Sequence, residues 1–179
     1  FEIKEFEKKY LTKVNIFGNN ITEERVVRDN LEVDEGDPFN ELLLVKSINN
    51  LKSLNIFGKV EYELVSEDKD KKVLNITVSE KPTGEIFASA GAGTQGSTIG
   101  FGVKENNFLG KNISLDTNLR LSDETIKGAF SVINPNWNYS DKTLITSIES
   151  SVTDRLTDYG YETGTTGFTL GSAWEQYDD

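Results

Sequence analysis

Residues Lys111–Ser122 read KNISLDTNLRLS, and their side chains alternate between two kinds. The apolar side chains share one parity of the stretch: Ile113, Leu115, Leu119 and Leu121. Polar and charged side chains fill the other parity, so a strand here has one apolar face and one polar face. Twelve residues at about 3.3 Å each, if tilted, cross a hydrocarbon layer roughly 25 Å tall. The stretch therefore predicts a transmembrane strand of a β-barrel.

The composition excludes several classes of protein. The 179 residues contain no cysteine and no histidine, so a disulfide framework, a thiolate metal site and histidine-dependent catalysis are excluded. The net charge of −11 disfavours nucleic acid as a partner, because no basic stripe is present to contact phosphates. No run of about 18 apolar residues exists, which excludes a transmembrane helix. We expect no enzyme, no cofactor and no metal site.

The chain has two halves of different character, and we place their boundary at Lys81–Gly84, where a proline and a glycine interrupt the pattern. The first half holds 13 Lys and Arg against 17 Asp and Glu; the second half holds only 6 against 13. Because the chain opens on Phe1 without a signal-peptide pattern, we interpret it as an excised or mature segment.

The first half predicts the order strand, helix, helix, strand, strand. The first strand covers Tyr10 to Ile16, and Thr22 is the expected N-cap of the first helix, with Ile21 packing onto Val26. The rest of that helix's buried stripe is Val27 and Leu31. The second helix, which ends near Leu54, buries Leu44, Ile48 and Leu51. The last two strands centre on residues 60–64 and 74–78, and residues 67–72 form the loop between them.

The second half predicts six strands near residues 85–94, 98–107, 111–122, 125–134, 142–153 and 161–175. Aromatic residues near the strand ends suit a membrane interface. These residues are Trp137, Tyr139, Tyr159, Tyr161 and Trp174. We expect the longer connections, 134–141 and 154–160, to lie together on the outer side of the membrane.

Five segments resemble a known family. VNIFGNNITEERVVRDNL (Val14–Leu31), EGDPFN (Glu35–Asn40), LNIFGKVEYEL (Leu54–Leu64) and NITVSEKPTG (Asn75–Gly84) are similar to a POTRA domain, the last before a barrel. GAGTQGSTIGFGVKENNFLGKNISL (Gly91–Leu115) is similar to the opening barrel strands of BamA-type outer-membrane protein assembly factors.

The chain departs from this family in two respects. We expect a glycine close behind the NFLG motif, where Lys111 and Asn112 stand instead. The sixteen-stranded barrel of the family and its later Arg-Gly-Phe loop are also not contained in this chain.

The resemblance implies an α+β POTRA domain (β-α-α-β-β) followed by antiparallel transmembrane β-barrel strands, an incomplete barrel fragment. We expect residues 1–9 to end a preceding POTRA domain, residues 10–82 to form a POTRA domain and residues 85–179 to form about six barrel strands. The implied function is folding and insertion of β-barrel proteins in the bacterial outer membrane, with the POTRA domain in the periplasm. The implied partners are unfolded outer-membrane protein clients, accessory assembly lipoproteins and the lipid bilayer.

The resemblance also implies two sites that work by strand pairing. The POTRA edge strand would bind clients through its backbone; it comprises Lys59, Val60, Glu61, Tyr62, Glu63, Leu64, Val65 and Ser66. The first barrel strand would form a lateral gate, and its glycines predict weak pairing and a weakly fixed register; it comprises Glu85, Ile86, Phe87, Ala88, Ser89, Ala90, Gly91, Ala92, Gly93 and Thr94.

Other readings stay open at this point. Lys59, Glu61 and Glu63 can instead mark an ordinary edge protected by charge, and the glycines can permit curvature or lie beside aromatic rings. A related POTRA-barrel transporter, for autotransporter assembly or two-partner secretion, fits the same pattern. A soluble β-rich binding module would place Ile113, Leu115, Leu119 and Leu121 against a second sheet.

Overall fold

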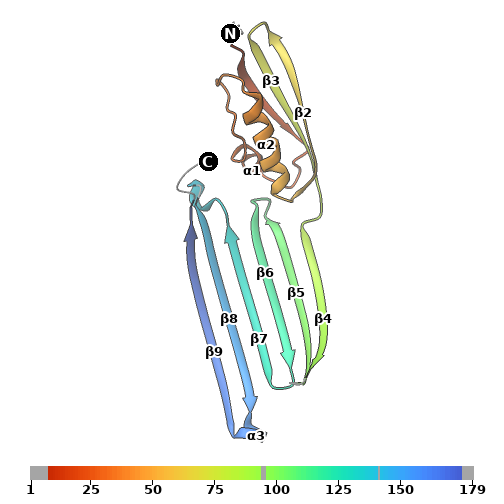
Figure 1. The fold of residues 1–179 in the computed structure, drawn as a ribbon, viewed down its shortest axis with the longest axis vertical. Helices are drawn as coiled ribbons and strands as arrows, with labels where there is room; N and C mark the ends of the chain where they lie inside the picture. Colours follow the sequence, from red (N-terminus) through yellow and green to blue (C-terminus); the bar gives the residue numbers. More distant parts are fainter. Residues whose placement is uncertain (1–7, 94–95, 141, 175–179) are drawn as a thin grey trace, which may run out of the picture. The chain divides into compact units, whose positions relative to one another are not determined.

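The computed structural model describes residues 8–93, 96–140 and 142–174 (Figure 1). Residues 1–7, expected to end a preceding domain, and Thr94 of the expected gate strand lie outside the described residues. The chain divides between Pro82 and Thr83 into two compact units. Each unit is described by itself below.

The first unit is a three-stranded sheet with two helices. Its elements are β1 (Tyr10–Phe17), α1 (Glu24–Arg28), α2 (Glu41–Ser53), β2 (Phe57–Asp68) and β3 (Lys71–Glu80). The strand order is β1-β3-β2, with β1 parallel and β2 antiparallel to β3. The predicted α+β order is confirmed, and β2 and β3 extend into the segment expected as a loop, because Ser66 pairs with Lys72.

The core of this unit lies between the helices and one face of the sheet. Leu44, Ile48 and Leu51 of α2 are buried as predicted from their spacing. Asn40 caps α2 by accepting a hydrogen bond from the Leu42 N–H at 2.9 Å. Every buried hydrophobic side chain of the described residues belongs to this unit, between Leu11 and Val78.

The first helix differs from its prediction. It begins at Glu24, its N-cap is Glu23, and no side chain caps it. Ile21 is 72% exposed, so the expected contact with Val26 is wrong, although Val26 and Val27 are buried. Leu31 follows the helix and packs partly buried against the core.

The second unit is an antiparallel sheet of six strands in chain order (Figure 1). Its strands are β4 (Gly84–Gly93), β5 (Gly96–Phe108), β6 (Ile113–Ser122), β7 (Thr125–Asn134), β8 (Thr143–Arg155) and β9 (Tyr161–Ala173). A 3-10 turn, Trp137–Tyr139, connects β7 to β8, and the short helix α3 (Leu156–Tyr159) connects β8 to β9. Within the described residues this sheet is open, with β4 and β9 at its edges.

One prediction about the connections is wrong. In a sheet whose neighbours are consecutive antiparallel strands, successive connections alternate between the two ends. Residues 135–140 therefore lie at the end where the chain enters the sheet, and residues 156–160 lie at the opposite end (Figure 1). Exposed aromatic residues mark both ends, Trp137 and Trp174 at the first, Tyr159 and Tyr161 at the second. The side chain of Tyr139 is outside what the structure describes.

The turn between β5 and β6 explains the missing glycine. Asn112 adopts a positive φ of 55°, the left-handed conformation for which glycine was expected and which asparagine tolerates better than most residues. Its N–H donates to Oδ1 of the buried Asn107 at 2.8 Å. Asn112 therefore adopts the left-handed conformation in this turn that glycine adopts most readily.

Candidate functional site

The two faces of the six-stranded sheet differ in polarity. Side chains of cross-strand partners point to the same face, so the register of the strands defines that face. One face collects apolar side chains from all six strands: Ile86, Ala88, Ala90, Ile99, Phe101, Val103, Leu115, Leu119, Leu121, Ile126, Phe130, Val132, Ile148, Val152, Phe168 and Leu170.

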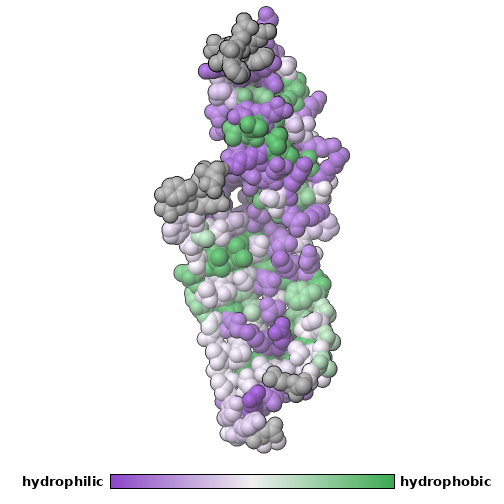
Figure 2. All heavy atoms as spheres, viewed as in Figure 1, coloured by the Kyte–Doolittle hydropathy of each residue, from purple (hydrophilic) through white to green (hydrophobic). Residues whose placement is uncertain are grey.

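This apolar face is not covered by a second layer within the described residues. Leu119, Phe168 and Leu170 are 42%, 64% and 65% exposed. The second sheet that a soluble binding module requires is therefore missing from the described part of the chain. Figure 2 shows broad pale and green areas over the six strands, whereas purple, hydrophilic residues crowd the surface of the first unit.

The opposite face of the sheet is mostly polar, although Phe87, Ile133 and Ile145 also point to it. Asp116, Asn118 and Arg120 of β6 point to it, and Lys127 of β7 forms an ion pair with Glu149 of β8 at 2.6 Å. A sheet with one apolar and one charged face is the arrangement of a barrel wall between lipid and a wet interior. None of the described helices is long and apolar enough to span a membrane.

Strand β2 is one edge of the first unit's sheet and contains the predicted client-binding residues 59–66. It pairs with β3 along one side, and no described strand pairs with its other side. Val60 is buried, Tyr62 is 45% exposed, and Glu61 and Glu63 are exposed. An ion pair of 2.7 Å joins Lys59 to Glu61. The edge thus offers backbone groups to solvent, flanked by charged side chains.

Strand β1 is the other edge of that sheet, and a loop covers its N-terminal part. The Leu11 N–H donates to the Asp37 carbonyl at 2.9 Å, and the Gly36 N–H donates to the Leu11 carbonyl at 2.7 Å. The Phe39 N–H donates to the Lys9 carbonyl at 2.7 Å. Of the two edges, β2 is therefore the more accessible to an added strand.

Strand β4, the predicted gate strand, is an edge of the six-stranded sheet. It forms ten consecutive pairs with β5, from Gly84 with Glu105 to Gly93 with Gly96, without a register shift. The register is therefore continuous on this side of the strand, and the expected weak pairing at the gate seam stays a prediction. No described strand pairs with the other side of β4.

Side chains of β4 explain why β5 contains glycines. The Phe87 ring lies where a Cβ atom at Gly102 would stand, so any other residue at Gly102 would displace it. Ser89 Oγ would lie 2.6 Å from a Cβ atom at Gly100. An aromatic ring over a cross-strand glycine fixes register, and here it fixes that of β4 on β5. Gly91 and Gly93 have open space where a side chain would stand.

The comparisons with known proteins agree with this arrangement. Residues 9–81 match the family model of the POTRA domain, described as a surface antigen variable number repeat. The outer membrane protein assembly factor BamA of Neisseria meningitidis serogroup B is 30% identical over 131 residues, which are 72% of this chain and 16% of that protein. BamA of Neorickettsia risticii is 32% identical over 105 residues, 58% of this chain and 14% of that protein. The resemblance to BamA-type outer membrane protein assembly factors is confirmed, and residues 9–81 form a POTRA domain.

Solved structures support the same fold. The crystal structure of BamA from Haemophilus ducreyi lacking POTRA domains 1–3 matches 90% of this chain and 32% of that chain, with a TM-score of 0.78 and 21% identity. CdiB from Acinetobacter baumannii matches 93% of this chain and 33% of that chain, with a TM-score of 0.58 and 16% identity. The BamA-type fold, a POTRA domain followed by antiparallel barrel strands, is therefore confirmed.

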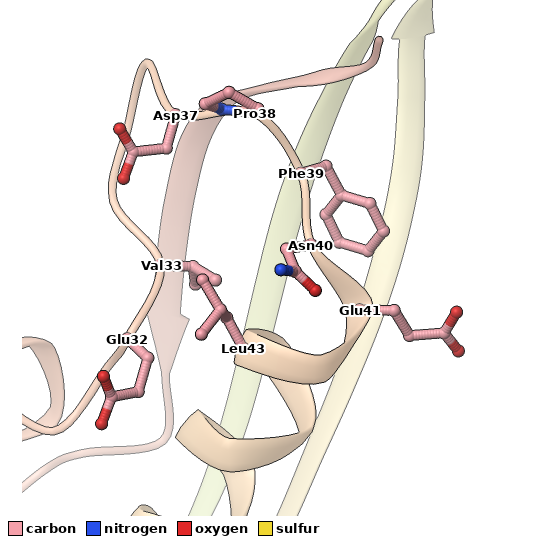
Figure 3. A pocket seen from close by; sticks show the side chains of 8 residues that line it. All are labelled: Glu32, Val33, Asp37, Pro38, Phe39, Asn40, Glu41 and Leu43. Atoms are coloured by element: carbon pink, nitrogen blue, oxygen red, sulfur yellow. The ribbon is translucent and has the colours of Figure 1, made fainter. Parts of the chain in front are cut away.

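The POTRA domain also contains an open pocket of about 680 Å³ (Figure 3). The loop before α2 and the first turn of α2 line it with apolar and acidic side chains: Glu32, Val33, Asp37, Pro38, Phe39, Asn40, Glu41 and Leu43. Lys72 of β3 places its ammonium group 4.1 Å from the centre of the Phe39 ring. The same loop contains the residues that cover β1.

Sequence reasoning missed one carboxylate of the POTRA domain. Glu80 accepts hydrogen bonds from the backbone N–H groups of Asn20, Ile21 and Thr22 at 3.0, 3.0 and 2.6 Å. Partial burial raises the pKa of Glu80, but the hydrogen bonds from Thr22, Ile21 and Asn20 outweigh it and leave the pKa lowered. Glu80 holds the segment that leads into α1, and its position at the end of β3 gave no signal of this role.

Proposed function

We propose that this chain is part of an outer-membrane protein assembly factor that folds and inserts β-barrel proteins by strand templating. The POTRA domain lies in the periplasm, and the six strands form part of a barrel wall in the outer membrane. The clients are unfolded outer-membrane proteins, and accessory assembly lipoproteins and the lipid bilayer are the other partners. The relatives' names support this role.

The β2 edge carries the proposal. It is an accessible edge on a sheet whose opposite edge is covered. An added strand would pair through N–H and C=O groups, which every client sequence possesses. Backbone pairing thereby accounts for a broad range of clients and uses no catalytic residue.

The free side of β4 is the second pairing edge of the proposal. Its paired side is held in register by Phe87 on Gly102 and by ten consecutive pairs with β5. We propose that β4 and β5 remain together while a client strand adds to the free side of β4. The gate then opens at this edge, and the β4–β5 ladder stays intact.

A proline scan of β2 tests the client edge. The backbone N–H groups of neighbouring residues point to opposite sides of a strand, so proline at one of Glu61 and Tyr62 removes a hydrogen bond to β3, and proline at the other removes an outward donor. The probe is a peptide of the chain's own β6, ISLDTNLRLS, and its binding to the chain in detergent is measured by fluorescence anisotropy.

We expect the outward proline variant to keep its helical circular dichroism and to weaken binding by about fivefold or more, the loss of at least one backbone hydrogen bond. The inward variant should lose structure instead. Unchanged binding in both variants, with the fold intact in at least one, would contradict the proposal.

A POTRA-barrel transporter is the second candidate, and the likeness to CdiB structures favours it. That likeness is smaller than the likeness to BamA, with TM-scores of 0.58 against 0.78. An assembly factor should bind strand peptides of unrelated sequence with similar affinity, whereas a dedicated transporter should discriminate among them. A panel of such peptides in the same anisotropy assay separates the two candidates.

A further inference from the structure

The β1 edge is blocked between Lys9 and Val14 in two different ways. The loop at Gly36–Phe39 satisfies the backbone of Lys9 and Leu11. Pro38 also forms a bridge with Tyr10, and Figure 3 shows the loop passing beside the β1 ribbon. Pro38 has no backbone N–H, so it cannot donate a hydrogen bond to another strand that approaches from outside. A register shift between Leu11 and Lys13 then separates this part of β1 from Val14.

At Val14 the edge backbone groups are bonded by side chains and not by the backbone of the loop. The Val14 N–H donates to Oε1 of Glu35 at 2.9 Å, and the Val14 carbonyl accepts from the Arg28 guanidinium at 3.0 Å. A neighbouring strand would supply the same two partners, one acceptor and one donor. The carboxylate and the guanidinium therefore occupy the two backbone groups that an incoming strand needs.

The two side chains are held in place by each other and by α1. Arg28 lies 3.6 Å from Glu35 and donates from Nε to Glu24 at 2.7 Å. Both partners are about 40% exposed, so the ion pair itself adds little to stability. Their hydrogen bonds to Val14 occupy the backbone N–H and C=O at which a further strand would pair.

We propose that Arg28 and Glu35 form a side-chain cap that closes the β1 edge and restricts strand pairing in the POTRA domain to the β2 edge. The proposal rests on the proposed function only in assuming that added strands are clients. Edge strands invite unwanted pairing unless something blocks them. A cap on one edge gives the domain a single direction in which a client strand can add.

The test removes the cap and asks which edge binds. A photocrosslinking residue is placed either at Lys13 on β1 or at Glu63 on β2, both exposed positions. The chain in detergent is then irradiated with the ISLDTNLRLS peptide. The cap variant carries Arg28→Ala and Glu35→Ala. The matched control carries Arg25→Ala and Asp29→Ala, which removes a 3.4 Å ion pair of α1.

We expect the unmodified chain and the control to crosslink at position 63 and only at background level at position 13. The cap variant should raise the yield at position 13 by about 25-fold, because two net backbone hydrogen bonds of about fivefold each multiply. Glu35→Gln, which keeps an acceptor for the Val14 N–H, should remain closed. If the double variant does not fold, Glu35→Ala alone is judged by the same criterion.

The result separates this proposal from the proposed function. A gain at position 13 without any crosslink at position 63 would support the cap and contradict client binding at β2. A folded cap variant that stays at background at position 13 would overturn the cap, as would an unmodified chain that crosslinks equally at both positions.

Discussion

Glu80 shows how one side chain can hold a segment that has no regular structure of its own. Its ionised form accepts the hydrogen bonds of Asn20, Ile21 and Thr22, which is why its pKa is lowered. A carboxyl group with a lowered folded pKa stabilises the fold above its unfolded pKa of about 4.3, and the contribution is lost as pH falls through the folded value.

We therefore expect Glu80→Gln to lower the free energy of unfolding at neutral pH by about 1.5–3 kcal/mol, the range for hydrogen bonds to a charged group. The difference from the unmodified chain should shrink toward zero below the folded pKa. Denaturant unfolding at 222 nm, at pH 7 and at stepwise lower pH, measures it. Glu63→Gln on exposed β2 is the control, and an effect of Glu80→Gln that is equal at all pH values would refute the assignment.

Contacts of this kind could not be predicted from the sequence. Glu80 and Thr22 are 58 residues apart, and nothing local marks Glu80 as the partner of that segment. The expected N-cap at Thr22 was wrong for the same reason, because both the side chain and the N–H of Thr22 bond to Glu80 and α1 begins later. Phe87 over Gly102 likewise became visible only with the register of β4 and β5.

The strands themselves could be predicted well because their signal is local. Alternation along residues 111–122 fixes which side chains share a face, and the register confirms that Leu119 and Leu121 lie with Phe101 and Ile126 on one side. The end of the sheet at which a connection lies is not a local property. It depends on how many strands precede the connection. The prediction from length alone therefore placed the connection between β7 and β8 at the wrong end of the sheet.

Neighbouring residues of β6 provide a matched test of the two faces. Leu119→Lys places a charge on the apolar face, at a cost of about 2–4 kcal/mol deep in a bilayer, whereas Asn118→Lys places it on the polar face. We expect the first variant to lose co-flotation with lipid vesicles in a density gradient and the second to retain it. Equal flotation of both variants would contradict a lipid-facing assignment of Leu119.

The two units of the chain suit different surroundings, water for the first and lipid for the second. The POTRA domain buries an apolar core of its own, and every buried hydrophobic side chain of the described residues belongs to it. The six-stranded sheet leaves its apolar side chains exposed, among them Ile86 at 86%. Open edges are a second difficulty for the sheet, because each unpaired backbone group in hydrocarbon costs several kcal/mol.

We therefore expect residues 1–84 to be a monomer in buffer and residues 85–179 to aggregate unless detergent is present. The whole chain should also aggregate without detergent, because one exposed apolar face is enough to drive association. Light scattering of the three polypeptides with and without detergent measures this, and detergent should convert the two sheet-containing samples to uniform particles while leaving residues 1–84 unchanged. A sharp monomer peak of the whole chain in detergent-free buffer would mean that water, not lipid, is the solvent of this sheet, and both the barrel assignment and the insertion function would then be wrong.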